Sequence, residues 1–256
     1  MPKPRSQPAA AFEWRSLPPM AYARWEPQAL PLEDGRVLVV GRNGQVWNDR
    51  DGWIKRDDLP PEVLDGVRAH WTAAPELVRA NGALAGVRGL AWDARGGRWT
   101  PIERLPERTP AGTLALPDGT TLTAGGKRYV APNPFATALD RVSLRPPRGR
   151  ARTRRLRVAR ADPTLTRLPD GRVLVTGGYR IEVAAPDVEN FVPVGETEVI
   201  DPAGGTIAPG GTLAIPRYGH AAAALPDGTI LLAGGADGTH YSSGAAEIGR
   251  PLAPAG

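Results

Sequence analysis

The residues of this chain best suited to chemistry are a run of arginines. Positions 144–160 carry eight arginines and no acidic residue, although the net charge of the whole chain is only +5. A guanidinium group is a rigid fork of donors that fits phosphate and carboxylate oxygens. The sequence therefore predicts an anion-recognising segment, and three interpretations are open: docking of an acidic protein, contact with a nucleic-acid backbone, or a solvated loop. The candidate partner-binding residues are Arg145, Arg148, Arg150, Arg152, Arg154 and Arg155.

The local sequence of this segment predicts its conformation. Pro146, Pro147 and Gly149 favour an extended loop, followed by a strand at Leu156–Val158. No aromatic residue is interleaved with the arginines, so stacking of bases is not expected there. A backbone contact with nucleic acid and an acidic protein partner both remain open.

The histidines and the common catalytic motifs give little chemistry. His70, His220 and His240 lie at no metal-ligand spacing. There is no Gly-x-Ser-x-Gly motif, and Lys127 lacks the flanking residues of a phosphate-binding loop. A structural role is expected for His220, whereas His240 is a candidate for ligand contact. We expect no catalytic residue, no metal site and no cofactor.

The composition bears on the cellular location of the protein and on whether it crosses a membrane. The chain has 256 residues, no cysteine, 31 glycines and 28 prolines. It has neither a signal-peptide core nor an apolar run long enough to span a membrane. A cytoplasmic protein without membrane association is expected. Residues 1–10 are predicted to be a flexible tail, and residues 11–256 a single domain.

One phrase recurs along the chain: a Leu-Pro-Asp-Gly-type turn, a short apolar run and a glycine pair. Such internal repetition indicates a repeat architecture. Asp and Gly supply the conformations that tight hairpins need, and the runs between them are rich in the residues that strands prefer. Each repeat is therefore predicted to form four short strands. The turns lie at 32–35, 116–119, 168–171 and 225–228, with a weaker copy at 81–82.

An arginine recurs ten residues before the turn aspartate. It is present in all four clear copies, at the predicted start of a strand, and a structural role is expected for it. These residues are Arg24, Arg108, Arg160 and Arg217.

The segments 92–126 and 198–235 resemble kelch repeats of the bacterial type. The resemblance covers nearly the whole chain and implies an all-β fold, a kelch-type β-propeller of four-stranded blades around a central channel. Two departures stand out. The second repeat lacks the glycine pair, and the arginine-rich stretch occupies the place of a hairpin in the fourth.

The ends of the chain indicate how such a ring would close. Residues 246–251 align with 197–202, and the strand due next is supplied by Phe12–Trp14. We therefore predict five blades, one of them a composite of N- and C-terminal strands. The alternative is a fragment that closes by oligomerising or by binding another chain.

The resemblance also bears on activity. Some kelch propellers are copper radical oxidases, which need a Tyr crosslinked to a Cys, and this chain has no Cys. Others bind or isomerise sugars at the channel mouth. For this chain two interpretations of the channel-mouth residues stay open: a small-molecule or sugar site, or ordinary solvated loops. The candidate channel-mouth residues are Arg42, Asn43, Arg128, Tyr179, Arg180, His240 and Tyr241.

The leading hypothesis is a non-enzymatic protein-interaction scaffold, which acts either alone or as a subunit of a larger assembly. Two long insertions, Lys55–Arg68 and Ile181–Glu196, are candidate docking loops. Trp71, Tyr179 and Phe191 are candidate anchors, because aromatic residues dominate interface energetics. Carbohydrate binding and nucleic-acid binding through Arg145–Arg155 are the alternatives.

Overall fold

The computed structural model describes residues 11–21, 23, 26–31, 37–40, 44–48, 52–54, 76–80, 83–93, 98–102, 111–129, 136–185, 188–239 and 242–252. Every regular element in these ranges is a β-strand, which confirms the predicted all-β class. The described residues contain no helix with the length and apolar character to cross a membrane. The chain divides into two compact units, Ala29–Thr109 and the remainder. The predicted single domain over residues 11–256 stays a prediction.

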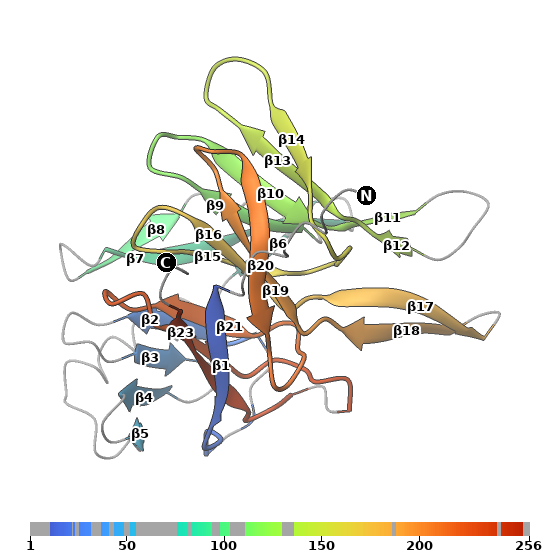
Figure 1. Cartoon of the computed structure of the whole chain (residues 1–256). Coiled ribbons are helices and arrows are strands. Elements are labelled where there is room, and N and C mark those ends of the chain that lie inside the picture. The colour runs from blue at the N-terminus through green and yellow to red at the C-terminus, as the bar shows by residue number, and fades with distance from the viewer. Residues whose placement is uncertain are drawn as a thin grey trace, which may run out of the picture. The chain divides into compact units, whose positions relative to one another are not determined.

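The larger unit contains three four-stranded antiparallel sheets and two separate hairpins (Figure 1). The first sheet is β14 (Arg152–Arg155), β13 (Arg141–Arg145), β10 (Thr121–Gly125) and β9 (Ala111–Ala115). The second is β15 (Thr164–Arg167), β16 (Val173–Thr176), β19 (Glu196–Asp201) and β20 (Thr206–Thr212). The third is β1 (Phe12–Leu17), β23 (Ala246–Pro251), β22 (Ile230–Ala233) and β21 (Ala221–Ala224). The hairpins are β11 (Lys127–Tyr129) with β12 (Ala136–Ala138), and β17 (Tyr179–Ala185) with β18 (Val188–Pro193).

The repeated Leu-Pro-Asp-Gly segments form the same turn in each of these sheets. In the first, Gly119 N donates to Leu116 O at 2.9 Å, and Leu116 N donates to Thr120 O at 2.8 Å. The Asp118 carboxylate accepts from the backbone N–H of Thr120 at 2.9 Å. Gly119 has φ +79°, the left-handed conformation that glycine adopts without strain. The turns at Asp170 and Asp227 repeat this pattern.

The core lies between consecutive sheets. All four residues of β16 are buried, because the two faces of this strand contribute to different clusters. Val173 and Val175 pack with Leu122 and Leu144 of the first sheet. Leu174, on the opposite face, packs with Ile230 of the third sheet. A strand buried on both faces reads as a continuous apolar run, which is what these repeats show in sequence.

Strands from the two ends of the chain share the third sheet, as predicted. β1 pairs antiparallel with β23, with Trp14 opposite Gly249 and Phe12 opposite Pro251. The indole Nε1 of Trp14 donates to Gly210 O of the second sheet at 3.2 Å. A Cβ on Gly249 would lie 2.7 Å from the Trp14 ring, so the small residue opposite this strand is required for the pairing.

The glycine pairs allow the backbones of neighbouring repeats to approach. Gly126 N donates to Arg160 O at 2.9 Å, and Gly178 N donates to Arg217 O at 3.1 Å. Gly177 has φ +57°, and a Cβ there would collide with the Arg217 carbonyl oxygen. These two glycine pairs therefore contact the arginine-bearing loop of the following repeat.

The smaller unit contains one four-stranded and one three-stranded sheet in the residues described. The buried side chains of the first include Val37, Val39 and Trp47. Its strands are β2 (Gln28–Pro31), β3 (Val37–Val40), β4 (Gly44–Asn48) and β5 (Gly52–Ile54). The second has β6 (Glu76–Ala80), β7 (Ala83–Asp93) and β8 (Arg98–Ile102).

The second repeat departs from the predicted four strands. Its two inner strands are merged in β7, which pairs with β6 through residues 83–88 and with β8 through residues 89–93. This is the repeat in which the sequence lacks the glycine pair, since Gly86 is followed by Val87.

Three local predictions need correction. The arginine-rich segment is a hairpin and not an extended loop, and its strand is Arg152–Arg155 rather than Leu156–Val158. Pro146, Pro147 and Gly149 form the turn of this hairpin. The repeated arginines Arg160 and Arg217 do not begin strands, because each precedes its strand in an irregular loop. The insertion Ile181–Glu196 is mostly the β17–β18 hairpin, which projects away from β19 in Figure 1.

Candidate functional site

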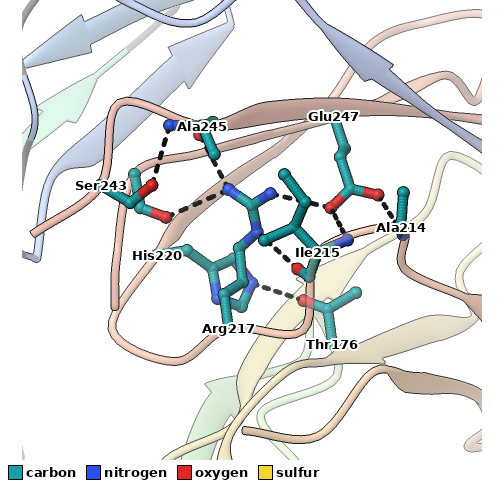
Figure 2. A network of polar contacts seen from close by, with 9 residues as sticks. Thr176, Ala214, Ile215, Arg217, His220, Ser243, Ala245 and Glu247 are labelled. Atoms are coloured by element: carbon teal, nitrogen blue, oxygen red, sulfur yellow. Dashed lines mark hydrogen bonds and ion pairs between the residues drawn. The ribbon is translucent and has the colours of Figure 1, made fainter. Parts of the chain in front are cut away.

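The most elaborate polar cluster in the described residues surrounds the buried side chain of Arg217 (Figure 2). Its Nη2 donates to Glu247 Oε1 at 2.8 Å. Its Nη1 donates to the carbonyls of Ala245, at 2.8 Å, and Gly234, at 3.3 Å. Its Nε donates to Ile215 O at 3.1 Å. The Glu247 carboxylate in turn accepts from the backbone N–H groups of Ala214 and Ile215. We call this arrangement the arginine–glutamate clamp.

The second sheet contains the same clamp, built from Arg160 and Glu198. Arg160 Nη2 donates to Glu198 Oε1 at 3.0 Å, and its Nη1 donates to the carbonyls of Gly177 and Glu196. The Glu198 carboxylate accepts from the backbone N–H groups of Arg157 and Val158. Both side chains are buried, with exposed fractions of 0% and 2%.

The clamps explain the repeated arginines as structural residues. Burial lowers the pKa of Arg160 and of Arg217, and the carboxylate beside each opposes that shift. Most of the guanidinium N–H groups of these two arginines donate to backbone carbonyls of the protein itself. These groups are therefore not presented to a ligand. Arg24 and Arg108 lie outside the described residues. The first sheet has no glutamate at the equivalent position. There Ser143 lies opposite Thr123, whereas in the second sheet Glu198 lies opposite Val175.

His220 is also a core residue, as predicted. Its Nε2 lies 2.9 Å from Thr176 Oγ1, and its Nδ1 is buried with no hydrogen-bond partner in the structure. Burial, aided by the charge of Arg217, lowers the pKa of His220 to about 3. The imidazole is therefore neutral at physiological pH, locked between the second and third sheets.

The predicted channel-mouth residues divide into three groups. Arg128, on β11, and Arg180, on β17, are exposed. Tyr179 is buried, with 6% of its surface exposed, and packs against Tyr218 at a ring-centroid distance of 4.9 Å. The others, Arg42, Asn43, His240 and Tyr241, lie outside the described residues, as do Lys55–Arg68, His70 and Trp71.

Of the predicted aromatic anchors, Phe191 is accessible. It is 38% exposed on β18, and its ring lies 4.6 Å from that of Tyr179. Val183, on the adjacent strand, is 54% exposed. The side chain of Tyr179 supports the base of this hairpin from the interior, because it belongs to the buried cluster with Ala161 and Ala236.

The candidate site with the strongest charge is the basic hairpin, which we define as residues 141–155, comprising β13, β14 and their turn. All four residues of β14 are exposed. Arg152 Nη2 donates to Pro202 O at 3.4 Å, and Arg154 Nε donates to Gly205 O at 2.9 Å. These carbonyls belong to the turn between β19 and β20 of the neighbouring sheet. Both guanidinium groups are therefore held by hydrogen bonds to neutral oxygens, which leave their charge uncompensated.

The other arginines of the basic hairpin are less constrained. Arg155 pairs with Asp140 at 2.9 Å, and 81% of its side chain is exposed. Arg145, Arg148 and Arg150 are exposed, and their side chains have no hydrogen bond or ion pair with any described residue. The six predicted partner-binding arginines thus lie on one hairpin, and Asp140 is the acidic residue that pairs with one of them.

One further carboxylate lies close to the basic hairpin. Asp118 is in the turn between β9 and β10, and the next residue of that turn, Gly119, lies against the Pro147 ring of the hairpin turn. The backbone N–H of Thr120 is the main cause that lowers the pKa of Asp118, and the charge of Arg152 contributes in the same direction. This carboxylate is engaged in its own turn, so the hairpin retains an excess of positive charge.

Sequence reasoning missed the two clamp glutamates. Glu198 and Glu247 occupy the same position in the aligned segments 197–202 and 246–251, four residues before a proline. That coincidence, together with an arginine at a fixed offset from each turn, was the available signal. It could have been found by asking which acid neutralises each repeated arginine.

Comparison with known proteins adds little to this geometry. No protein-family model matches the chain, and no curated protein matches it. Among solved structures, one match is a "novel fungal alcohol oxidase with catalytic diversity among the AA5 family, in complex with copper", at 17% identity and a TM-score of 0.44. The match covers 91% of this chain and 53% of that protein, so the chain spans about half its length. The described residues contain no group of three or more His, Asp or Glu side chains that could hold a metal ion.

Proposed function

We propose that this protein is a non-enzymatic interaction module that binds an acidic partner protein through the basic hairpin. The observation that carries the proposal is the concentration of exposed, weakly neutralised arginines on one rigid element. The side chains of Arg145, Arg148 and Arg150 have no hydrogen-bond or ion-pair partner in the described residues, and those of Arg152 and Arg154 are held by neutral carbonyls. Such a surface attracts carboxylates over a Debye length of about 8 Å at physiological salt.

The scaffold in this proposal is a kelch-type β-propeller of five blades, closed by the sheet that combines β1 with β21, β22 and β23. Three features support it: four-stranded sheets in repeat order, arginine–glutamate clamps at equivalent positions, and β1 paired with β23. A rigid scaffold that presents variable hairpins is a common basis for recognition.

A charge-matched comparison tests the function. The site variant carries Arg145→Gln, Arg148→Gln and Arg150→Gln. The control variant carries Arg15→Gln and Arg167→Gln, with Arg172→Gln as its third change, at exposed positions of other elements. Both lose three positive charges at exposed positions, and the control additionally loses the exposed Arg172–Asp170 ion pair, which contributes about 0–1 kcal/mol.

Binding of a labelled oligoglutamate peptide, measured by fluorescence anisotropy, distinguishes the two. Exposed ion pairs contribute roughly 0.2–1 kcal/mol each, so three of them correspond to about a tenfold loss of affinity in the site variant. The control variant should keep its affinity within about twofold. Equal losses in both variants would refute the basic hairpin as the binding site, and so would absence of binding to the unmodified protein at low salt.

A further inference from the structure

The outer edge of the basic hairpin has the properties of a strand acceptor. β14 is the last strand of the sheet β14-β13-β10-β9, and no described strand pairs with its other edge. An open edge presents a row of backbone donors and acceptors that can hydrogen-bond to an added strand. Each residue of β14, from Arg152 to Arg155, is exposed, so no described side chain covers this edge.

The charges of β14 decide which strand can be added. A second copy of β14 would place arginines opposite arginines, which is destabilising. An apolar strand would remove guanidinium groups from water without neutralising them. An acidic strand, in contrast, would form opposite-charge pairs across the new ladder. The edge is therefore protected against self-association and apolar strands but open to carboxylates.

The pleat predicts the spacing of those carboxylates. Successive side chains of a strand point to opposite faces, so Arg152 and Arg154 lie on one face and Arg155 on the other. The first two guanidinium groups are already oriented by the carbonyls of Pro202 and Gly205. Because their positions are fixed before binding, little side-chain entropy is lost when a carboxylate pairs with them. A matching strand would place acidic residues at every second position.

We propose that β14 accepts an extended segment of the partner, with acidic residues at alternate positions, as an additional strand of its sheet. This inference rests on the proposed function, because it specifies how the acidic partner is held. The carboxylates of the added strand pair with Arg152 and Arg154, and its backbone completes the ladder along β14. The turn arginines Arg148 and Arg150 serve mainly as long-range attraction.

Synthetic peptides test this mode of binding. The probe is a capped octapeptide of alternating Glu and Thr, compared with a block isomer of four Glu followed by four Thr. Two further versions of the alternating peptide carry N-methyl groups, one on every Glu and the other on every Thr. N-methylation removes the backbone donors of one strand edge and leaves the side chains and charge unchanged.

Strand addition predicts clear differences among the probes. The alternating peptide should bind about tenfold more tightly than the block isomer, and at least one methylated version should lose about tenfold in affinity. Hydrogen exchange at residues 152–155 should slow when the alternating peptide binds. Equal affinity for all four peptides would overturn strand addition while leaving the proposed function intact. If none of them binds, the proposed function fails as well.

A pair of charge-matched variants provides the second measurement. Arg152→Gln with Arg154→Gln should weaken binding of the alternating peptide about tenfold, whereas Arg148→Gln with Arg150→Gln should weaken it less than about threefold. Circular dichroism checks that both variants are folded. Equal losses in the two variants would contradict the strand model. Tighter binding of a single-stranded oligonucleotide of equal charge would overturn the partner class.

Discussion

The arginine–glutamate clamps predict an unusually large cost for a one-atom change. In Glu247→Gln the side chain keeps its shape but loses its charge, and one carboxylate oxygen becomes an amide nitrogen. Arg217 would then be a buried cation without its paired carboxylate, since its side chain is 1% exposed. The amide nitrogen would also face the backbone N–H of Ala214 or Ile215, because both oxygens of Glu247 now accept from these groups.

The magnitude follows from these two losses. Removing one partner of a buried ion pair costs about 3–5 kcal/mol, because the other charge stays buried. Domains of this kind have free energies of unfolding of roughly 5–15 kcal/mol, so the variant should retain only part of its stability. With a denaturant slope near 2–3 kcal/mol per molar urea, the unfolding midpoint should fall by about 1–2 M. Glu198→Gln should behave in the same way, since its clamp has the same geometry.

Urea unfolding followed by tryptophan fluorescence and circular dichroism is the assay. The control is Arg172→Gln, which removes an exposed ion pair with Asp170 in which the side chains are 46% and 49% exposed. Exposed pairs contribute about 0–1 kcal/mol, so this variant should unfold near the wild-type midpoint. If Glu247→Gln and the control shift the midpoint equally, the clamp contributes no more than a surface pair and the reasoning is refuted.

A double replacement sharpens the test. Buried ion pairs can often be exchanged for apolar residues without loss of stability. Here Arg217→Met combined with Glu247→Leu should remain at least as destabilised as Glu247→Gln. The reason is that five backbone groups, from Ala214 N to Ala245 O, would lose their hydrogen-bond partners. A double variant with wild-type stability would show that these backbone groups find other partners.

Two other predictions concern the same region. Gly177→Ala should lower the free energy of unfolding by more than about 3 kcal/mol, since its Cβ would collide with the Arg217 carbonyl. Gly171→Ala, with φ +88° and nothing within 4 Å of its Cβ, should lower it by about 1 kcal/mol. Equal unfolding midpoints of the two variants in urea would contradict this. Because the pKa of His220 falls to about 3 on folding from an unfolded value near 6.5, unfolding binds a proton and stability is lost as pH falls through this window. At pH 4.5 this loss of stability is about 2.5 kcal/mol relative to pH 7, and His220→Gln should remove it; parallel pH profiles of both proteins would count against it.

The turns and strands of the repeats could be predicted because their causes are local. Asp118, Asp170 and Asp227 each cap the turn that follows them, and the glycine after each adopts a positive φ. The pairing of β1 with β23 was predictable too, since two aligned segments showed that one strand was missing from the last repeat.

What the sequence did not reveal depends on contacts between distant residues. The burial of Arg160 and Arg217 requires glutamates 38 and 30 positions further along, which no local pattern joins to them. The path of the arginine-rich segment was misjudged for a similar reason. Strand β14 contains arginines at every position but Thr153, and it forms because it pairs with β13 and is held by Pro202 and Gly205.

The partnership between β1 and β23 has a consequence for biosynthesis. On the ribosome β1 emerges well before β23, and nearly the entire described chain must be translated before the two strands can meet. During that interval the apolar surface of Phe12 and of its cluster partners Leu168 and Ile230 lacks part of its final covering. Contacts between residues so far apart in sequence also slow folding. Until β23 is released, this uncovered apolar surface exposes the nascent protein to aggregation.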